Sequence, residues 1–273
     1  MTQPSPPSPL ATPAPWDLVS SAYAEEIVPM FTPYAERALD LAGVRAGMRV
    51  LDVACGPGTL SFLAAARGAS VDALDFSPGM VEHLRARAAR DSVDRVTAQI
   101  GDGQDLPFDD GVYDAAFSMF GLMFFPDRAR GFGELRRCLK DGCAAVVSSW
   151  QPMETNVPFC ATMFSVLREH VPGLPFGGSD PPLAAQPVFA EEMRAAGFRD
   201  VEVHEVRYSF DMPSTAEGFA SMERTMAPLA MLSRKMGPAW TAVRDKMYAS
   251  LAARFGRGPQ SITMPAWLGR GVR

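Results

Sequence analysis

A strand, a glycine-containing turn and a helix follow one another between residues 49 and 67, and this succession restricts the fold more than any other segment. The strand carries Asp52, and the turn Ala54-Cys-Gly-Pro-Gly58 leads into the helix. Glycines leave bare backbone at the carboxyl end of the strand, which is where α/β proteins bind their ligands. Asp75 ends the next apolar segment, where a carboxylate can accept hydrogen bonds from both hydroxyls of a ribose. The pattern therefore indicates a ligand that contains a nucleoside.

Short apolar segments continue to alternate with amphipathic segments after this turn. Strands are expected at residues 49–53, 70–74, 96–100, 113–118, 144–150 and 201–210. Helices are expected at residues 59–67, 78–90, 129–139, 159–171 and 189–196, with Ser77 as the N-cap of the second. Alternation at this spacing favours right-handed crossovers and a parallel sheet with helices on both faces.

Proline content and a change in periodicity divide the chain into a tail, a core and a cap. Six prolines predict a disordered tail over residues 1–15, and two short helices, broken near Pro29 and Pro33, are expected to cover the ligand site over residues 16–44. The core is expected to comprise residues 45–151, 187–213 and 260–273. Two helical insertions, 152–186 and 214–259, are expected to form the cap, because they follow the fifth and sixth strands, whose ends face the ligand.

Composition excludes several classes of partner. The chain has 273 residues, of which 47% are hydrophobic, and a net charge of −5, so we expect no nucleic acid and no anionic membrane surface as partner. Four cysteines without CxxC spacing indicate reduced thiols. No apolar segment approaches the roughly 18 to 20 residues that cross a bilayer, and the first residues lack the basic-then-apolar order that is expected of a signal peptide. We therefore expect a cytoplasmic protein that acts on a small molecule.

The glycine turn does not have the spacing of a dinucleotide site. Such sites space their glycines as GxGxxG, whereas this chain has Asp52-x-Ala54-x-Gly56-x-Gly58. The segment resembles the first motif of class I S-adenosylmethionine-dependent methyltransferases, with Ala54 in place of the first glycine. Residues 74–80 (LDFSPGM) resemble the second motif of that family, and residues 101–108 (GDGQDLPF) resemble the third.

The resemblance covers about residues 45–150. Residues 113–122 (YDAAFSMFGL) look like the fourth strand of that family, and residues 139–142 (LKDG) look like the turn before the fifth. The motifs are most similar to the methyltransferase type 11 group, which includes quinone-pathway C-methyltransferases. This resemblance implies an α/β fold with a Rossmann-like seven-stranded, mostly parallel sheet, the last strand antiparallel, helices on both faces and a helical cap. It also implies S-adenosylmethionine as the cofactor.

The resemblance gives roles to the residues around the methionine part of the cofactor. Asp52 would hold the ammonium group, directly or through water, and Ala54, Gly56 and Gly58 would lie under the methionine. Tyr23, from the N-terminal helices, would reach the carboxylate. On their own, the two glycines also fit a simple tight turn between a strand and a helix.

Further positions correspond to the ribose and to the adenine edge. Asp75 would bind the ribose hydroxyls, and Asp102 would accept a hydrogen bond from the adenine amino group. Gly103 and Gln104 would lie along the edge of the ring.

The last four positions concern the adenine faces and the sulfonium. Phe76 and Met80 would enclose the two faces of adenine, although each also fits the hydrophobic core. Ser118 and Met119, at the end of the fourth strand, would border the sulfonium, where backbone carbonyls suit a cation.

Methyl transfer from a sulfonium depends on alignment and exclusion of water rather than on a fixed catalytic signature. Of the three histidines, His170 shares a helical face with Phe159, Met163 and Val166, and it is the candidate general base. The alternative is a histidine satisfied within the cap. The chain shows no set of Asp and Asn ligands for magnesium, so no metal site is predicted.

The acceptor is expected to be small and mainly apolar. Residues 152–264 hold ten of the 16 methionines, which predicts a flexible apolar pocket, although filling of the cap interior is the alternative. Residues 118–121 lack the Asn/Asp-Pro-Pro-Tyr/Phe motif of methyltransferases that act on adenine or amide nitrogens. We therefore expect methyl transfer to oxygen or carbon of a natural-product, quinone or lipid-like molecule.

Two other functions remain open at this point, and the oligomeric state is open as well. One is an NAD-binding oxidoreductase on a related sheet, against which the missing GxGxxG spacing argues. The other is a protein that binds S-adenosylmethionine without catalysis, because no obligatory catalytic residue exists whose loss would reveal it.

Overall fold

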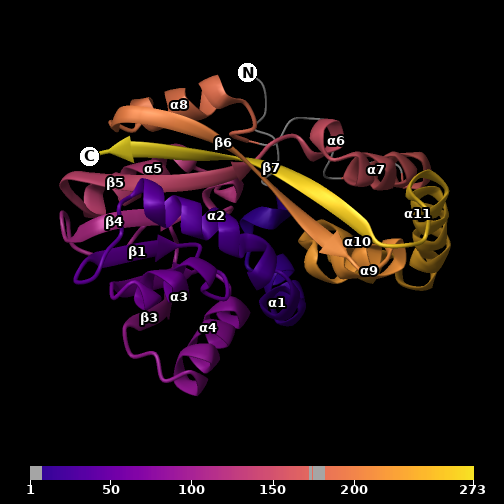
Figure 1. Cartoon of the computed structure of the whole chain (residues 1–273), viewed down its shortest axis with the longest axis horizontal. Coiled ribbons are helices and arrows are strands. Elements are labelled where there is room, and N and C mark those ends of the chain that lie inside the picture. The colour runs from indigo at the N-terminus through magenta and orange to yellow at the C-terminus, as the bar shows by residue number, and fades with distance from the viewer. Residues whose placement is uncertain (1–7, 172–173, 175–181) are drawn as a thin grey trace.

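A seven-stranded sheet forms the centre of the molecule (Figure 1). The computed structural model describes residues 8–171, 174 and 182–273. The strands, in chain order, are β1 (Arg49–Val53), β2 (Ser70–Asp75), β3 (Val96–Ile100), β4 (Tyr113–Ser118), β5 (Leu139–Trp150), β6 (Arg199–Met212) and β7 (Gln260–Val272). They lie in the order β3-β2-β1-β4-β5-β7-β6, and β7 runs antiparallel to its neighbours β5 and β6. The predicted mostly parallel sheet with an antiparallel last strand is confirmed.

The central strands are apolar on both faces, as strands of a covered parallel sheet must be. Val50, Leu51 and Val53 of β1 are fully buried, and so are Ala115 and Phe117 of β4. The register of β1 pairs Val53 with Leu74, and that of β2 pairs Asp75 with Ile100, so the carboxyl ends of neighbouring strands lie side by side. The loops that follow these strands therefore meet at one edge of the sheet.

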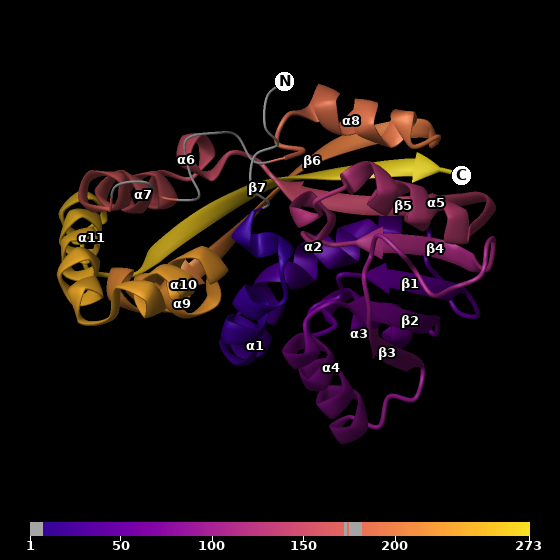
Figure 2. The same cartoon turned by 180° about the vertical axis from the view of Figure 1, so that it is seen from behind.

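Helices cover both faces of the sheet. On one face, α2 (Val28–Leu41) packs against α3 (Thr59–Ala66), and on the other α5 (Arg128–Cys138) packs against α8 (Gln186–Ala195). Figures 1 and 2 show the two layers from opposite sides. The helix α4 (Pro78–Arg90) begins as predicted, because the Ser77 hydroxyl accepts the Met80 N–H at 3.2 Å and Pro78 fits the first turn.

A group of helices lies beyond the sheet, and we call it the cap. It contains α6 (Met153–Asn156), α7 (Pro158–His170), α9 (Thr215–Thr225), α10 (Ala227–Met236) and α11 (Trp240–Phe255). The strands β6 and β7 extend into it, because their pairing continues to Met212 and Gln260 whereas β5 ends opposite Ala266 (Figure 1). None of the helices within the described ranges is long and apolar enough to cross a membrane. The division of the chain into domains stays a prediction.

The N-terminal segment differs from the expected disordered tail. Residues 1–7 lie outside the described part, but Pro9–Ala11 forms the 3-10 helix η1, and α1 (Ala14–Glu26) begins within the predicted tail. Its proline at position 15 does not prevent this, because a helix tolerates proline in its first turn, where no backbone N–H is needed.

The break between the two N-terminal helices also lies elsewhere than predicted. Helix α1 ends at Glu26, the N–H of the cap residue Ile27 donates to the Tyr23 carbonyl, and Pro29 then occupies the first turn of α2. Pro33 lies inside α2 without interrupting it. The prediction from the prolines therefore placed the break between the two helices two or more residues too late.

Candidate functional site

The carboxyl ends of β1 to β4 surround a cavity of about 210 Å³, to which η1 and α1 also contribute residues. We call it the small cavity. Ten of the thirteen predicted cofactor-binding residues line it: Tyr23, Ala54, Gly56, Asp75, Phe76, Met80, Asp102, Gly103, Gln104 and Met119. The other three do not line it and are buried: Asp52, Gly58 and Ser118. Motifs that are 50 residues or more apart in sequence thus meet around one space.

The turn after β1 presents bare backbone to the small cavity. Ala54, Gly56 and Gly58 all have positive φ, at 55°, 53° and 87°. A Cβ at Gly56 would meet no atom within 4 Å, whereas one at Gly58 would lie 2.8 Å from Cγ of Leu84. Position 56 therefore requires glycine because its backbone is left-handed. Position 58 requires glycine for the same reason and also because α3 packs closely on α4 there.

The carboxylate of Asp75 joins two turns. Its Oδ2 accepts the Gly56 N–H at 2.8 Å, and its Oδ1 accepts the Ser77 N–H at 2.9 Å. Burial raises the pKa of Asp75 to about 6, although both hydrogen bonds oppose this shift. Each carboxylate oxygen keeps a free lone pair, so the group can still accept hydrogen bonds from a ligand.

Asp52 lies beneath the glycine turn with one oxygen unpaired. Its Oδ2 accepts the hydroxyl of Ser61 at 2.6 Å, while its buried Oδ1 has no partner among the residues that the structure describes. Burial raises the pKa of Asp52 to about 7 despite the bond from Ser61. A buried acceptor without a donor is costly, so this oxygen suits a cationic group or a water molecule that a ligand brings.

A pair of polar side chains forms the far edge of the small cavity. The backbone N–H and the side-chain amide of Gln104 donate to Oδ1 of Asp102, at 2.8 and 3.1 Å. The amide oxygen of Gln104 accepts the Asp127 N–H at 2.8 Å, which ties this edge to the start of α5. Asp102 is thereby held in place while it remains exposed to a ligand.

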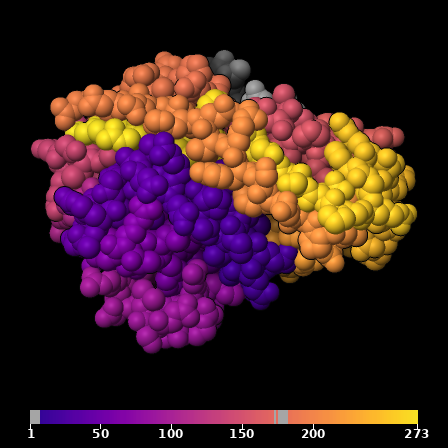
Figure 3. Space-filling model, in the orientation of Figure 1, coloured from indigo at the N-terminus to yellow at the C-terminus, as the bar shows by residue number. Residues whose placement is uncertain are grey.

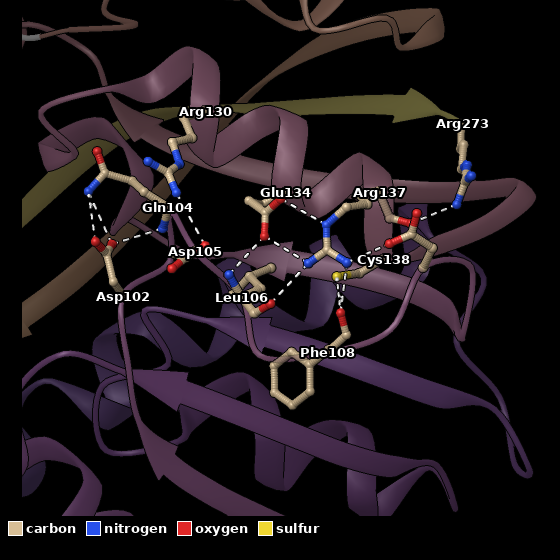
Figure 4. A network of polar contacts seen from close by, with 11 residues as sticks. Asp102, Gln104, Asp105, Leu106, Phe108, Arg130, Glu134, Arg137, Cys138 and Arg273 are labelled. Atoms are coloured by element: carbon tan, nitrogen blue, oxygen red, sulfur yellow. Dashed lines mark hydrogen bonds and ion pairs between the residues drawn. The ribbon is translucent and has the colours of Figure 1, made fainter.

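An ion-pair network behind this edge supports the loop over residues 101–110 (Figure 4). Arg137 pairs with Glu134 at 2.8 Å and donates to the carbonyls of Leu106 and Phe108, at 2.9 and 2.7 Å. The carboxylate of Glu134 in turn accepts the Leu106 N–H at 2.8 Å. Both residues belong to α5, so this helix fixes the loop that carries Asp102.

Helix α1 is fastened to the start of α4 and closes the small cavity on one side. The Oδ1 atom of Asp17 accepts the Ser77 hydroxyl at 2.5 Å and the Gly79 N–H at 3.0 Å. The indole N–H of Trp16 donates to the Leu10 carbonyl at 2.9 Å. Tyr23 lines the small cavity together with Asp75; burial raises the pKa of Tyr23, and the negative charge of Asp75 raises it further.

The turn after β4 packs directly on the glycine turn. Phe120 has a φ of 58°, which is unusual for an aromatic residue, and its N–H donates to the Ser148 hydroxyl at 2.8 Å. A Cβ at Gly121 would overlap the Cβ of Ala54. Ser118 is buried, and its hydroxyl accepts the Leu122 N–H at 3.1 Å, so its side chain supports this turn rather than facing the cavity.

A second cavity, of about 1210 Å³, lies between the N-terminal helices and the cap, and we call it the large cavity. Figure 3 shows the indigo N-terminal helices between the magenta core and the orange and yellow cap. Seven methionines line the large cavity: Met30, Met123, Met153, Met212, Met222, Met226 and Met264. Others, such as Met163, Met193 and Met247, are buried in the hydrophobic core. The methionines therefore serve both of the roles that the sequence left open.

Five residues line both cavities, and we call them the passage: Leu10, Trp16, Tyr23, Phe120 and Phe124. Four of the five are aromatic. The ring of Phe120 stacks on that of Trp150, with centroids 3.9 Å apart and planes at 17°, and the rings of Trp16 and Phe124 are 5.2 Å apart. The two cavities thus adjoin at an aromatic boundary.

The candidate base lies outside both cavities. His170 ends α7, and its Nδ1 is 3.0 Å from the Val166 carbonyl of the same helix. None of the three histidines is among the described residues that line either cavity. The shared helical face was correctly identified, but Phe159, Met163 and Val166 face the core rather than the cavity.

The sequence alone did not reveal most of the passage. Leu10 and Trp16 come from the segment that proline content assigned to the tail or to its border, so no local motif marked them. Phe120 and Phe124 follow the fourth strand, and their position next to Met119 was the only signal that pointed to them.

Comparison with known proteins identifies residues 50–142 with the family described as the methyltransferase domain. An uncharacterized protein of Mycobacterium tuberculosis is 34% identical over 58% of this chain and 54% of its own length. The chain thus spans about half the length of the first curated relatives it matches. The demethylmenaquinone methyltransferase of Clavibacter sepedonicus is 48% identical over 37% of this chain and 41% of its own length.

A further relative covers almost the whole chain. The nocamycin O-methyltransferase of Saccharothrix syringae is 28% identical over 92% of this chain and 94% of its own length. Among solved structures, the cyclase SpnF is similar with a TM-score of 0.60 and 19% identity, over 97% of this chain and 98% of that one. The Haemonchus contortus phosphoethanolamine N-methyltransferase 2 with S-adenosylhomocysteine has a TM-score of 0.58 and 18% identity, over 94% and 57%. At these identities the structural likeness concerns the fold alone.

Replacing Gly121 with alanine should disturb the contact between the two turns. The added Cβ overlaps that of Ala54, so we expect the free energy of unfolding in urea to fall by about 1–3 kcal/mol. Gly133→Ala is the matched control, because Gly133 lies within α5 and a Cβ there meets nothing within 4 Å. It should raise the free energy of unfolding by about 0.5–1 kcal/mol. Equal effects of the two substitutions would contradict the close contact.

The raised pKa of Asp52 predicts a pH-dependent effect of Asp52→Asn. The carboxyl titrates near pH 4 in the unfolded chain, so from about pH 4 to 7 the folded protein holds a proton that the unfolded chain has released. The wild-type protein therefore loses stability as pH rises through this window, and the variant does not. From pH 4.5 to 7.5, the free energy of unfolding of the variant should rise relative to wild type by about 2–4 kcal/mol. A constant difference would show that Asp52 is ionised throughout.

Proposed function

We propose that the chain transfers the methyl group of S-adenosylmethionine to a mainly apolar small molecule, because its residues 50–142 match a methyltransferase domain and an O-methyltransferase is similar over almost its whole length. The observation that carries this proposal is the junction of the two cavities. The small cavity has carboxylates and bare backbone suited to a nucleoside and an amino acid, and the large cavity is lined mainly by apolar side chains. The passage residues separate them at the point where a methyl group would cross.

The groups that line the small cavity match those of S-adenosylmethionine, and the cavity, at about 210 Å³, would have to widen to hold the whole molecule. Asp75 has free lone pairs for the ribose hydroxyls, and the unpaired Oδ1 of Asp52 suits the ammonium group through water. The open space at Gly56 leaves room for the methionine part on the backbone. Asp102 is positioned by Gln104 to accept a hydrogen bond from the adenine amino group.

The remaining predicted residues complete this proposed arrangement. Phe76 and Met80 line the cavity on the side of α4 and would enclose the adenine ring. Met119 lines it at the end of β4, where backbone carbonyls would face the sulfonium. Tyr23 lines both cavities, and its hydroxyl would reach the carboxylate of the methionine part.

The chemistry requires little of the side chains beyond alignment. When bound, S-adenosylmethionine supplies an electrophilic methyl group on a sulfonium. The aromatic residues of the passage exclude water and orient the acceptor, and these are the contributions that an in-line displacement with a neutral leaving group needs. No histidine base is proposed, because no histidine lines either cavity in the described residues. This favours acceptors whose oxygen or carbon nucleophile ionises readily.

The acceptor remains the less defined partner. We propose transfer to oxygen or carbon, which the names of the nocamycin O-methyltransferase and the demethylmenaquinone methyltransferase support by similarity. The methionines and aromatic residues of the large cavity support a natural-product, quinone or lipid-like molecule. All four cysteines are free thiols, in keeping with the proposed cytoplasmic location.

Titration calorimetry with S-adenosylmethionine tests the cofactor assignment. The wild-type protein should show saturable binding, and Asp75→Asn should bind at least about tenfold more weakly, because it loses a charged acceptor for the ribose hydroxyls. The exposed turn residue Asp109 supplies the control substitution, Asp109→Asn, which should bind like wild type. Circular dichroism melts of all three proteins establish that the variants fold. Unchanged affinity in Asp75→Asn would remove the ribose assignment.

A further inference from the structure

The large cavity has an excess of acidic side chains. Among the described residues, its lining contains four carboxylates and one basic side chain, that of Arg224; the carboxylates are Glu26, Glu154, Asp211 and Glu217. A cavity with this balance repels anions and lowers the free energy of a cation within it. The charge of the lining therefore bears on the kind of acceptor that can enter.

Two of the four carboxylates are neutralised by arginines. The guanidinium of Arg224 forms two hydrogen bonds with Glu26, at 2.8 and 3.1 Å, which lower the pKa of that carboxyl. Glu154 pairs with Arg168 of α7. These two pairs leave no basic side chain free in the lining.

Asp211 and Glu217 have no such partner. Within the described ranges, neither carboxylate forms an ion pair or a hydrogen bond, and both side chains are exposed. The residues outside the description, 1–7, 172–173 and 175–181, contain no Lys, Arg or His, so they cannot supply a basic side chain. The carboxylates at these two positions are therefore not paired with any basic side chain.

The first turn of α9 favours an acidic residue through the helix dipole, but the capping of this helix does not use the carboxylate of Glu217. This residue lies three positions after the N-cap Ser214, where a glutamate can accept the N–H of the cap residue. Here the Ser214 hydroxyl accepts the Glu217 N–H at 3.1 Å, but the reciprocal bond to the carboxylate is absent from the described contacts. The carboxylate is thus free to meet a ligand.

The two carboxylates lie at the cap end of the large cavity. Asp211 is near the end of β6, opposite Ser261 of β7, and Glu217 is in the first turn of α9. Figure 1 shows this end of β6 beyond the sheet, in the cap, whereas the passage residue Phe120 follows β4 in the core. The apolar lining extends between the two ends. With about 1210 Å³, the cavity exceeds the roughly 300–1,000 Å³ of most small-molecule sites.

From this arrangement we propose that the acceptor is a bulky apolar molecule of several rings that carries a protonated amine. Its amine lies at Asp211 and Glu217, and its methyl-accepting atom lies at the passage, at the opposite end of the molecule. This inference rests on the proposed function, because it assigns the large cavity to the acceptor. The same charges disfavour an acceptor with a carboxylate or phosphate at the cap end.

Three anthracene derivatives with the same ring system test the charge preference: the aminomethyl compound, the hydroxymethyl compound and the carboxylic acid. Fluorescence anisotropy measures their binding to the full-length protein at low ionic strength, with S-adenosylhomocysteine at saturation. The amine should bind about tenfold more tightly than the carboxylate, with the alcohol between them. Asp211→Asn combined with Glu217→Gln should reduce this ratio to about threefold or less. Glutamine also supports an N-terminal cap, so α9 is preserved.

A double variant with the same loss of charge elsewhere is the control. Asp109→Asn combined with Glu191→Gln changes two exposed residues that do not line the cavity, and it should keep the wild-type ratio. Equal or tighter binding of the carboxylate by wild type, an unchanged ratio in the Asp211/Glu217 variant, or no binding of any derivative would overturn the inference. Failure of S-adenosylhomocysteine to bind, measured separately by calorimetry, would instead overturn the proposed function.

Discussion

The carboxylate of Asp75 connects the turn after β1 to the turn after β2, because it accepts the backbone N–H groups of Gly56 and Ser77. These two turns would otherwise be independent loops, and the first is held in a left-handed conformation that depends on its glycines. Ser77 continues the connection, since its hydroxyl donates to Asp17 of α1. A single buried acid thus fixes the floor of the small cavity and, through Ser77, the helix that closes it.

Helix α1 relates the two cavities to each other. It lies against α4 on the core side and against α9 and α10 on the cap side, and the ion pair between Glu26 and Arg224 links it to α9. Trp16 and Tyr23 on this helix line both cavities. The same helix therefore closes the cofactor side from water and forms a wall of the acceptor side, so a ligand in one cavity contacts residues that also shape the other.

The sequence predicted the parts of the structure that local patterns determine. The strands β1, β3 and β4 and the helix α4 have the predicted bounds, because each is marked by apolar periodicity or a cap residue such as Ser77. The glycine turn and Asp75 were identified in the same way. The passage was not, because tertiary packing brings residues more than 100 positions apart, such as Leu10 and Phe120, to line the same two cavities. His170 lines neither cavity for a related reason: a helical face shows only that a side chain is covered, not whether a core or a cavity covers it.

A crystal structure with S-adenosylhomocysteine tests the central claim, that the passage is where the methyl group leaves the cofactor. We predict that the ribose hydroxyls lie on Asp75 and that the adenine edge lies at Asp102. The sulfur should point towards the large cavity, between the side chains of Trp16, Tyr23, Phe120 and Phe124. A sulfur atom directed away from these residues, or a ribose that does not contact Asp75, would contradict it. In that case the large cavity would lose its assignment as the acceptor site, even if the protein bound the cofactor.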